Sequence, residues 1–214
     1  MSTRYDLVVI GSGPAGEKGA AQAAYFGKKV ALIERSSYLG GTGINTGTVP
    51  SKTLRETALY FSGLRQRGLY GLDYSLKENI TVAELMYRKQ TVVENERSIV
   101  RTNLRRHNIE VIRGDARLKD KNTVTVHSHS GEEEDLQADF ILIATGASPH
   151  RPPGIPFDDV RICDSDTIFR IERIPKTMTV VGGGVIGSEF ACTFSALGVQ
   201  VTLLGASDRF LRRT

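Results

Sequence analysis

Two glycine-rich turns with the same spacing constrain the fold of this chain more than any other feature. Each has the pattern Gly-x-Gly-x-x-Gly, follows an apolar run and leads into a helix-like run. The glycines are Gly11, Gly13 and Gly16 in the first turn and Gly182, Gly184 and Gly187 in the second. In a strand–turn–helix unit, the first glycine makes the tight turn, the second admits a pyrophosphate facing the helix N-terminus, and the third packs helix against strand. One such pattern is a weak indication, but two in the same context predict two dinucleotide-binding units.

The strands that follow the two turns end differently. Residues 30–33 lead into Glu34, and an acid at this place is positioned to bind both hydroxyls of an adenosine ribose. Residues 199–204 lead into Gly205 instead. Without a carboxylate at that place, nothing repels a ribose 2′-phosphate.

Polar and basic residues follow Gly205 directly. They are Ser207, Arg209, Arg212 and Arg213. Such side chains would supply hydrogen-bond donors and positive charge to a phosphate, so the second unit is predicted to favour NADPH. A basic, solvated surface loop is the alternative interpretation.

Composition and charge narrow the class of protein. The chain is 40% hydrophobic and 24% charged, which is ordinary for a globular protein, and its net charge of +4 comes without a long Lys/Arg block, so nucleic acid is not expected. No run approaches the roughly 18 apolar residues of a membrane span, and the first strand begins too early to leave room for a signal peptide. Cys163 and Cys192 lie in unlike contexts, so we expect a cytoplasmic protein without structural disulfides.

The segments between the two turns predict a helical crossover and then a hairpin. Thr81 and Glu84 form a plausible capping box at the start of the second crossover helix. The expected elements, in chain order, are helices at about 51–66 and 81–107 with a polar link at 68–79 between them, strands at 109–112 and 122–129, a solvated turn at 132–135 and a buried strand at 140–144. His127 and His129 share one face of the hairpin; a metal pair is conceivable there, but we interpret them as surface residues and predict no metal site.

Residues 149–176, which contain several prolines, read as a linker into the second unit at 177–214. That unit has a strand, a helix and a strand. A dinucleotide half-fold needs at least a third strand, and two strands with one helix would leave a broad apolar face uncovered. The chain is therefore expected to be the N-terminal portion of a longer fold.

Five segments carry a resemblance to a known family. They are residues 11–35, 40–56, 144–149, 164–169 and 180–191. They resemble the two-dinucleotide flavoproteins, which include dihydrolipoamide dehydrogenase, glutathione reductase and mercuric reductase, and are most similar to soluble, Si-specific pyridine nucleotide transhydrogenases. The resemblance implies an α/β fold: a three-layer, FAD-binding Rossmann-like domain with an antiparallel meander over residues 1–148, then the start of an NAD(P)-binding Rossmann-like domain. It implies FAD in the first site and NADP or NAD in the second.

The glycine-rich segment departs from the disulfide reductases of this family. Their redox cysteines would stand at Gly43 and Thr48. Without a thiolate there, the usual route to reduction of lipoamide, glutathione or mercury is closed. Transhydrogenases show the threonine at the second position but often keep a cysteine at the first, which this chain lacks. Such enzymes do not need the dithiol, because the flavin takes the hydride from NADPH and returns it to NAD.

The resemblance also assigns site residues. Lys52 would lie beside the reactive edge of the flavin, pair with Glu189 and stabilise the charge of reduced flavin; an exposed lysine in a helix's first turn is the alternative. Arg212 matches an arginine of NADPH-linked glutathione reductases, whereas Ala206 lacks their other arginine. The expected cofactor-binding residues are Gly11, Gly13, Pro14, Ala15, Gly16, Glu34, Arg35, Gly41, Thr42, Ser51, Lys52, Ala116 (backbone to adenine), Thr145, Gly146, Gly182, Gly184, Ile186, Gly187, Glu189, Ser207 and Arg212.

Three interpretations of function follow from the sequence. The first is a transhydrogenase-type flavoprotein represented by its N-terminal half, with nicotinamide dinucleotides as partners. The second is a dithiol-lacking NAD(P)H:acceptor reductase of the same family, such as a quinone or dye reductase. The third is a non-catalytic FAD-binding fragment, since the family's C-terminal dimerisation domain has no counterpart here.

Overall fold

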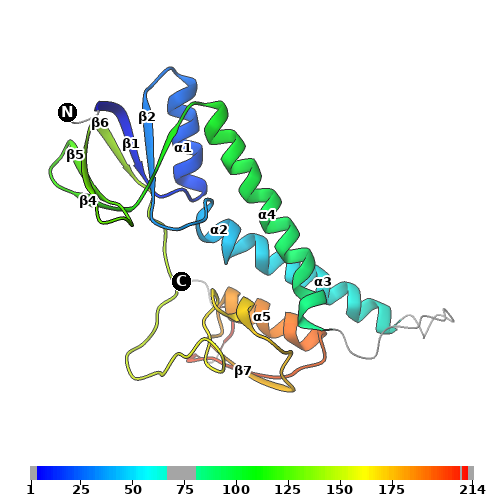
Figure 1. Ribbon diagram of the computed structural model, residues 1–214. Coiled ribbons are helices and arrows are strands. Elements are labelled where there is room, and N and C mark those ends of the chain that lie inside the picture. Colours follow the sequence, from blue (N-terminus) through cyan, green and yellow to red (C-terminus); the bar gives the residue numbers. More distant parts are fainter. Residues whose placement is uncertain (1–3, 67–80, 208, 212–214) are drawn as a thin grey trace. The chain divides into compact units, whose positions relative to one another are not determined.

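The computed structural model describes residues 4–66, 81–207 and 209–211. The chain divides into two compact units, Met1–Asn45 with Val93–Ser148 and Thr46–Val92 with Pro149–Thr214 (Figure 1). Helix α4 (Val82–Arg106) contributes to both units. These two units do not test the domain boundaries expected from the sequence, 1–148, 149–176 and 177–214, which stay a prediction.

A six-stranded sheet forms the centre of the first unit. Its strands are β1 (Arg4–Ile10), β2 (Val30–Glu34), β3 (Glu110–Arg113), β4 (Asp115–Leu118), β5 (Thr123–His127) and β6 (Glu133–Ile143). They lie in the order β3-β2-β1-β6-β5-β4, with β3, β2, β1 and β6 parallel and β6, β5 and β4 antiparallel. Sheet residues such as Val8, Ile33 and Leu136 form its core. This arrangement confirms the predicted α/β fold with an antiparallel meander.

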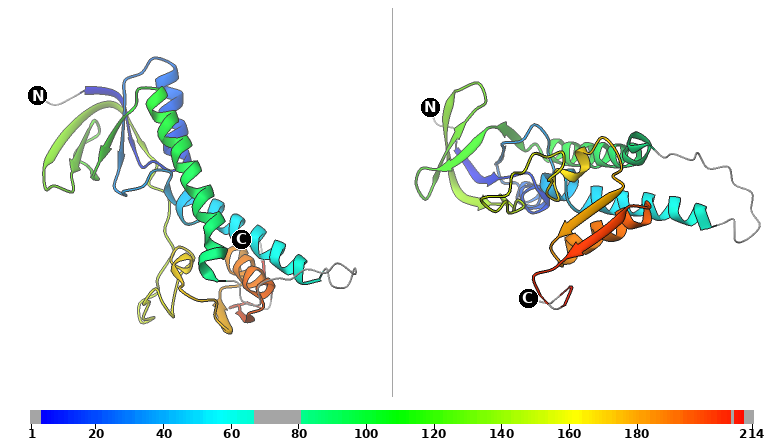
Figure 2. Two further views of the ribbon diagram at one scale, coloured as in Figure 1. Left: turned by 45° about the vertical axis from the view of Figure 1, so that its right-hand side comes forward. Right: turned by 90° about the horizontal axis from the view of Figure 1, so that it is seen from below.

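Helix α1 (Pro14–Tyr25) packs closely on this sheet because its buried face carries small residues. Gly16, Ala20 and Ala21 are buried, and a Cβ atom on Gly19 would lie 2.7 Å from Cδ2 of Leu142 in β6. The helix begins at Pro14, since proline suits a first-turn position whose N–H would be unpaired. Figure 2 shows α1 beside the C-terminal half of α4, where the Asn103 amide donates a hydrogen bond to the buried carboxylate of Glu17.

The crossover between β2 and β3 is helical, as predicted. It passes through α2 (Gly41–Asn45), α3 (Thr48–Gln66) and α4 before β3 pairs parallel to β2. The capping box is confirmed: Glu84 N–H donates to Thr81 Oγ1 (3.2 Å), and Thr81 N–H donates to Glu84 Oε2 (2.9 Å). The predicted polar link at 68–79 lies outside the described residues.

Two expectations about β6 are wrong. The run 132–135 is not a solvated turn, because β6 starts at Glu133 and pairs with β5, where its carboxylates meet Lys119 (2.5 Å from Asp135) and His127 (2.9 Å from Glu133). The strand at 140–144 is only partly buried. Phe140 is 73% exposed. Successive side chains of β6 point to opposite faces of the sheet, and within the described unit the face that carries Phe140 is not covered there. Strand β4 was not predicted, since its polar residues show no clear alternation.

The second unit is built around one apolar cluster. Its elements are α3, the first part of α4, η2 (Ile168–Arg170), β7 (Thr177–Val181), α5 (Val185–Ala196) and β8 (Gln200–Leu204). β7 and β8 are parallel. Phe194 of α5 is fully buried with Leu54, Met86 and Phe169, so α5 packs on α3 as well as on its own strands. None of the helices in the described part of the chain is long and apolar enough to cross a membrane.

Candidate dinucleotide sites

The first glycine turn has backbone geometry that only glycine can supply. Gly11 has φ +104°, and its N–H donates to the carbonyl of Ile33 (2.8 Å). A Cβ atom on Gly16 would lie 1.9 Å from the carbonyl oxygen of Gly11, so helix α1 can approach the turn only without a side chain there. The third glycine therefore has the packing role that the sequence predicted for it.

The N-terminus of α1 is left open toward this turn. Its N-cap is Gly13, and no side chain caps it. Pro14 has no N–H, and the first intrahelical bond of the turn runs from Glu17 N–H to Gly13 O (2.9 Å). The N–H groups of Ala15 and Gly16 thus have no acceptor within the helix, which is the arrangement that binds a phosphate.

Glu34 lies at the end of β2, beside the glycine turn. Its side chain is buried, at 7% exposure. Oε2 accepts hydrogen bonds from Ser12 N–H (2.9 Å) and Ser12 Oγ–H (2.5 Å), and Oε1 accepts one from Ser36 N–H (2.8 Å). A carboxylate offers about four acceptor positions, so room remains for a ribose hydroxyl. Arg35 follows on the exposed surface.

A second wall of the site comes from the loop after β2. Gly41, with φ +57°, lies against the turn so closely that its Cβ would be 2.8 Å from Cα of Gly13. Thr42 is exposed beside it. Gly43 packs under Pro14, and a Cβ there would lie 3.2 Å from Pro14 Cγ, which is tighter than most contacts of this kind.

Other expected residues of the first unit border the same sheet edge. A Cβ on Gly11 would lie 2.4 Å from the carbonyl oxygen of Ala144 and 3.5 Å from Cα of Thr145, which precedes Gly146. On the other side, Gly114 N–H donates to the carbonyl of Glu34 (3.1 Å), and Ala116 lies shortly after it in β4. The structure thus brings Glu34, Gly41 and Thr145 close to the first glycine turn, while Ala116 follows in the neighbouring strand.

The second glycine turn repeats this geometry in the second unit. Gly182 has φ +125° and donates its N–H to Leu204 O (2.8 Å), and a Cβ on Gly187 would lie 2.0 Å from Gly182 O. Helix α5 has Gly184 as its N-cap without a side-chain cap, and Ile186 is exposed in its first turn. The two turns are therefore close structural duplicates.

The segment after β8 lies over the second turn. Leu211 N–H donates to Gly183 O (2.8 Å), and Ser207 Oγ–H donates to Arg209 O (2.7 Å). The ring of Phe210 lies against Gly183 and Gly205. A Cβ on Gly183 would lie 2.4 Å from Phe210 Cδ1, and a Cβ on Gly205 would lie 2.9 Å from Phe210 Cε1. Sequence reasoning missed this aromatic contact. Arg212 and Arg213 lie outside the described residues.

The expected partners Lys52 and Glu189 lie on α3 and α5 of the second unit. Lys52 is exposed and Glu189 is half-buried, and no ion pair joins the two within the part of the chain described. Ser51 is half-buried in the first turn of α3. Among the described residues, Thr46 Oγ1 and Ser188 Oγ are buried without a hydrogen-bond partner, so each retains capacity to bond a ligand.

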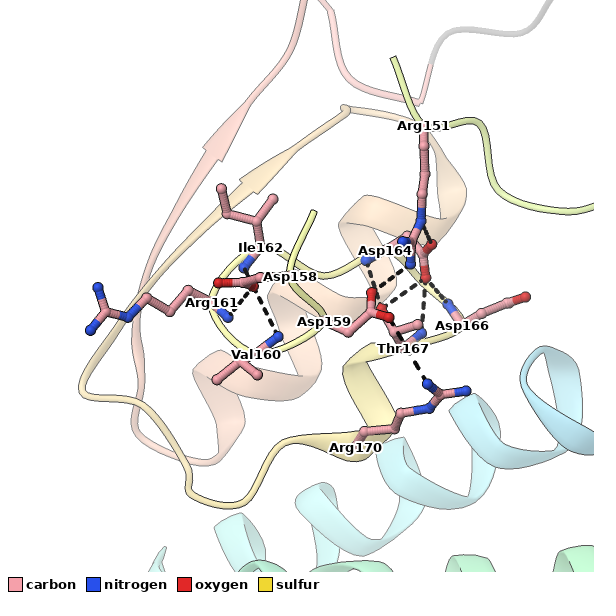
Figure 3. A network of polar contacts seen from close by, with 10 residues as sticks. All are labelled: Arg151, Asp158, Asp159, Val160, Arg161, Ile162, Asp164, Asp166, Thr167 and Arg170. Carbon is pink, nitrogen blue, oxygen red and sulfur yellow. Dashed lines mark hydrogen bonds and ion pairs between the residues drawn. The ribbon is translucent and has the colours of Figure 1, made fainter. Parts of the chain in front are cut away.

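A polar network orders residues 149–176, the connector that precedes β7 (Figure 3). The guanidinium of Arg151 bonds Asp159 (2.5 Å) and Asp164 (2.7 Å), and Asp164 Oδ1 accepts from Thr167 N–H (2.9 Å). Asp158 Oδ1 accepts three backbone N–H bonds, from Val160, Arg161 and Ile162, and these bonds lower the pKa of Asp158 to about 2. The predicted linker is therefore a folded segment held by ion pairs.

The remaining polar candidates do not form a metal site. Within the described residues, no group of three or more His, Cys, Asp or Glu side chains could hold a metal ion. His127 pairs with Glu133 in a shallow hollow on the meander, and His129 is exposed. Cys163 and Cys192 are both free thiols.

The structure contains two copies of one strand–turn–helix unit. An acid follows the second strand of one copy and a glycine follows that of the other. These copies define a protein with two dinucleotide-binding units. The family of pyridine nucleotide-disulphide oxidoreductases matches residues 5–214. The chain belongs to this family. Its resemblance to two-dinucleotide flavoproteins is thus confirmed.

Curated relatives match nearly the full length of this chain. The soluble pyridine nucleotide transhydrogenases of Mycobacterium bovis and Mycobacterium tuberculosis are each 47% identical over 208 residues, or 97% of this chain and 44% of theirs. That of Colwellia psychrerythraea is 36% identical over 207 residues, with the same coverage. The chain therefore spans less than half the length of the curated relatives it matches.

Solved structures agree with this assignment. The HOCl-induced flavoprotein disulfide reductase RclA from Escherichia coli is 34% identical, with a TM-score of 0.80 over 97% of this chain and 43% of RclA. LpdA from Mycobacterium tuberculosis is 28% identical, with a TM-score of 0.87 over 99% of this chain and 46% of LpdA.

Proposed function

We propose that this chain carries the flavin site and part of the nicotinamide site of an FAD-dependent oxidoreductase of the transhydrogenase type. In this proposal NADPH and NAD are the hydride donor and acceptor. FAD, when bound, supplies the ring that takes up a hydride and gives it back. The observation that carries the proposal is the duplicated turn whose two copies differ in the residue after the second strand: Glu34 in one and Gly205 in the other.

The first turn suits a flavin dinucleotide. The N–H groups of Ala15 and Gly16 would hold its pyrophosphate, and Glu34, already oriented by Ser12, would accept the ribose hydroxyls. Gly41 and Thr42 would face the pyrophosphate, the backbone near Ala116 the adenine, and Thr145 with Gly146 would close over the cofactor. Arg35, Ser51 and Lys52 belong to the same proposed set.

The second turn suits a phosphorylated nicotinamide dinucleotide. Gly182, Gly184, Ile186 and Gly187 would hold the pyrophosphate, and the position of Gly205 presents no carboxylate to a 2′-phosphate. Ser207, with Arg212, would supply donors to that phosphate. Glu189 is proposed to pair with Lys52 when the flavin is bound.

The absence of cysteine at Gly43 and Thr48 favours hydride exchange over disulfide reduction. The curated relatives named as soluble transhydrogenases support the same choice, and a cytoplasmic location belongs to this proposal. We further propose that residues 1–148 form an FAD domain, residues 149–176 a linker and residues 177–214 part of an NAD(P) domain. The last is called the first part of that domain because the chain covers 44% of those relatives.

The decisive measurement is the visible absorption spectrum of the purified chain after addition of FAD and, without oxygen, of NADPH. A flavin band that stays with the protein and bleaches with NADPH supports the proposal. Retained flavin that NADPH leaves unbleached limits the chain to an FAD-binding fragment. A protein that takes up no FAD contradicts the proposal.

A dithiol-lacking acceptor reductase is the second candidate, favoured by the 34% identity to a flavoprotein disulfide reductase. The two candidates separate in a steady-state assay with NADPH and either NAD or a quinone as acceptor. Hydride transfer to NAD with no other acceptor present supports the transhydrogenase. Turnover with quinone alone would assign the reductase.

A further inference from the structure

The loop that closes the first dinucleotide site is held by side chains that belong to no dinucleotide motif. Ser12 attaches it to the glycine turn, since Gly40 N–H donates to both the carbonyl and the hydroxyl oxygen of Ser12 (3.1 Å each). Gly41 then lies against Gly13. Residues 38–45 therefore pack directly against the glycine turn.

Asn45 ties this loop together from its far end. Its side-chain Nδ2 donates to Leu39 O (3.0 Å) and to Gly41 O (2.7 Å), so one amide spans the loop. The remaining oxygen, Oδ1, accepts a hydrogen bond from Nε of Arg97 (2.7 Å). Because both donors of the amide are already used, the Arg97 bond fixes which way the amide faces.

Arg97 comes from α4, far from the loop in sequence, and it makes two contacts with it. Besides bonding Asn45, its guanidinium lies over the ring of Tyr38, 3.8 Å from the ring centroid. Its side chain is only 18% exposed. A planar guanidinium can stack and donate from Nε at once, whereas the ammonium of lysine cannot.

The ion pair of Arg97 with Glu94 does not account for this placement. That pair is 3.3 Å long, lies along one helix, and involves a Glu94 side chain that is 60% exposed. Exposed pairs of this kind contribute little. The same Glu94 also faces Arg101 at 4.0 Å, so Arg101 is a matched arginine that lacks contacts with the loop among the described residues.

We infer that Arg97 is a positioning residue for the first dinucleotide site, holding residues 38–45 against the glycine turn through Asn45 and Tyr38. This inference rests on the proposed function, because it assumes that FAD is the ligand of that turn. Among the described residues, Arg97 has no hydrogen bond or ion pair with an expected cofactor-binding residue; it acts through Asn45 and Tyr38.

The first test is FAD affinity, measured by quenching of flavin fluorescence, for the wild type, Arg97→Ala, Arg97→Lys, Asn45→Ala and the Arg97→Ala/Asn45→Ala double variant. Loss of one charged hydrogen bond and a stacking contact is expected to raise the FAD Kd about tenfold in Arg97→Ala. Arg97→Lys keeps the charge but not the geometry, so it should not restore affinity. The double variant should be no weaker than the weaker single variant, and Arg101→Ala should match the wild type.

The second test needs no cofactor. Hydrogen exchange of the cofactor-free chain should be faster over residues 38–45, including the Gly40 amide, in Arg97→Ala, while β1 and β2 exchange as in the wild type. Unchanged exchange in the loop, or faster loop exchange with unchanged FAD affinity, overturns the inference. If the wild type itself takes up no FAD, the proposed function fails; the exchange data then still decide whether Arg97 holds the loop.

Discussion

At the scale of single residues, the two sites depend on places where a side chain is excluded. A Cβ atom on Gly16 or on Gly187 would lie only 1.9 Å or 2.0 Å, respectively, from a backbone carbonyl oxygen. The neighbour in each case is backbone rather than the end of a flexible side chain, so it cannot move aside cheaply. These glycines are therefore requirements of helix packing.

Replacement of Gly16 tests this directly. Gly16→Ala forces α1 away from the turn, and we expect a lower melting temperature together with loss of FAD uptake. Gly63→Ala is the matched control, because a Cβ at Gly63 meets nothing within 4 Å and alanine in a helix is favoured over glycine by about 1 kcal/mol. Thermal unfolding of both variants checks the pair. A Gly16→Ala protein as stable as the wild type would refute the packing argument.

Under the proposed function, Gly205 is expected to govern the choice between the two nicotinamide dinucleotides. Gly205→Glu restores an acid after the second strand, and we expect it to weaken NADPH binding about tenfold while improving NADH binding. The added Cβ would lie 2.9 Å from Phe210 Cε1, so this half-exposed ring must shift to admit it. Gly205→Ala controls for that displacement. Equal changes for NADPH and NADH would mean that the residue acts on space and not on charge.

At the scale of elements, the sequence predicted what depends on local pattern and missed what depends on the fold. β1, β2 and the crossover follow from apolar runs, glycines and a capping box, which act on neighbours in the chain. The start of β6 was misjudged because Glu133 and Asp135 look solvated until β5 and β4 bring His127 and Lys119 beside them. Arg97 with Asn45 and Phe210 with Gly183 were invisible for the same reason: side chains distant in sequence meet only in the folded chain.

The connector makes a prediction about pH. The pKa of Asp158 lies at about 2 because three backbone N–H groups bond its carboxylate, against an ordinary value of 3.8. A folded-state pKa below the unfolded one stabilises the fold above pH 4, and that contribution is lost as the pH falls toward 2. Asp158→Asn should therefore lower the melting temperature at pH 6 but approach the wild type near pH 2. A constant difference between the two proteins over this range would contradict the assignment.

At the scale of the whole molecule, the residues that would carry electrons decide the class of chemistry. A family member with a redox dithiol stores one electron pair in the flavin and a second in the cysteines. This chain has Gly43 and Thr48 at the matching positions, and its two cysteines are a half-buried thiol, whose pKa is raised by burial and by Asp158 and Asp159, and an exposed thiol on α5. The surroundings of Cys163 therefore disfavour its thiolate, the form that acts as a redox nucleophile.

The lack of redox cysteines at Gly43 and Thr48 predicts the outcome of a reductive titration. The flavin-loaded chain, titrated with dithionite without oxygen, should take up a single electron pair per flavin and leave oxidised lipoamide and glutathione unreduced in the presence of NADPH. Cys163→Ser and Cys192→Ser should titrate like the wild type, because neither thiol takes part. A second electron pair that disappears in either serine variant would show that a thiol of this chain has replaced the missing redox pair, and it would favour a disulfide reductase over the proposed transhydrogenase.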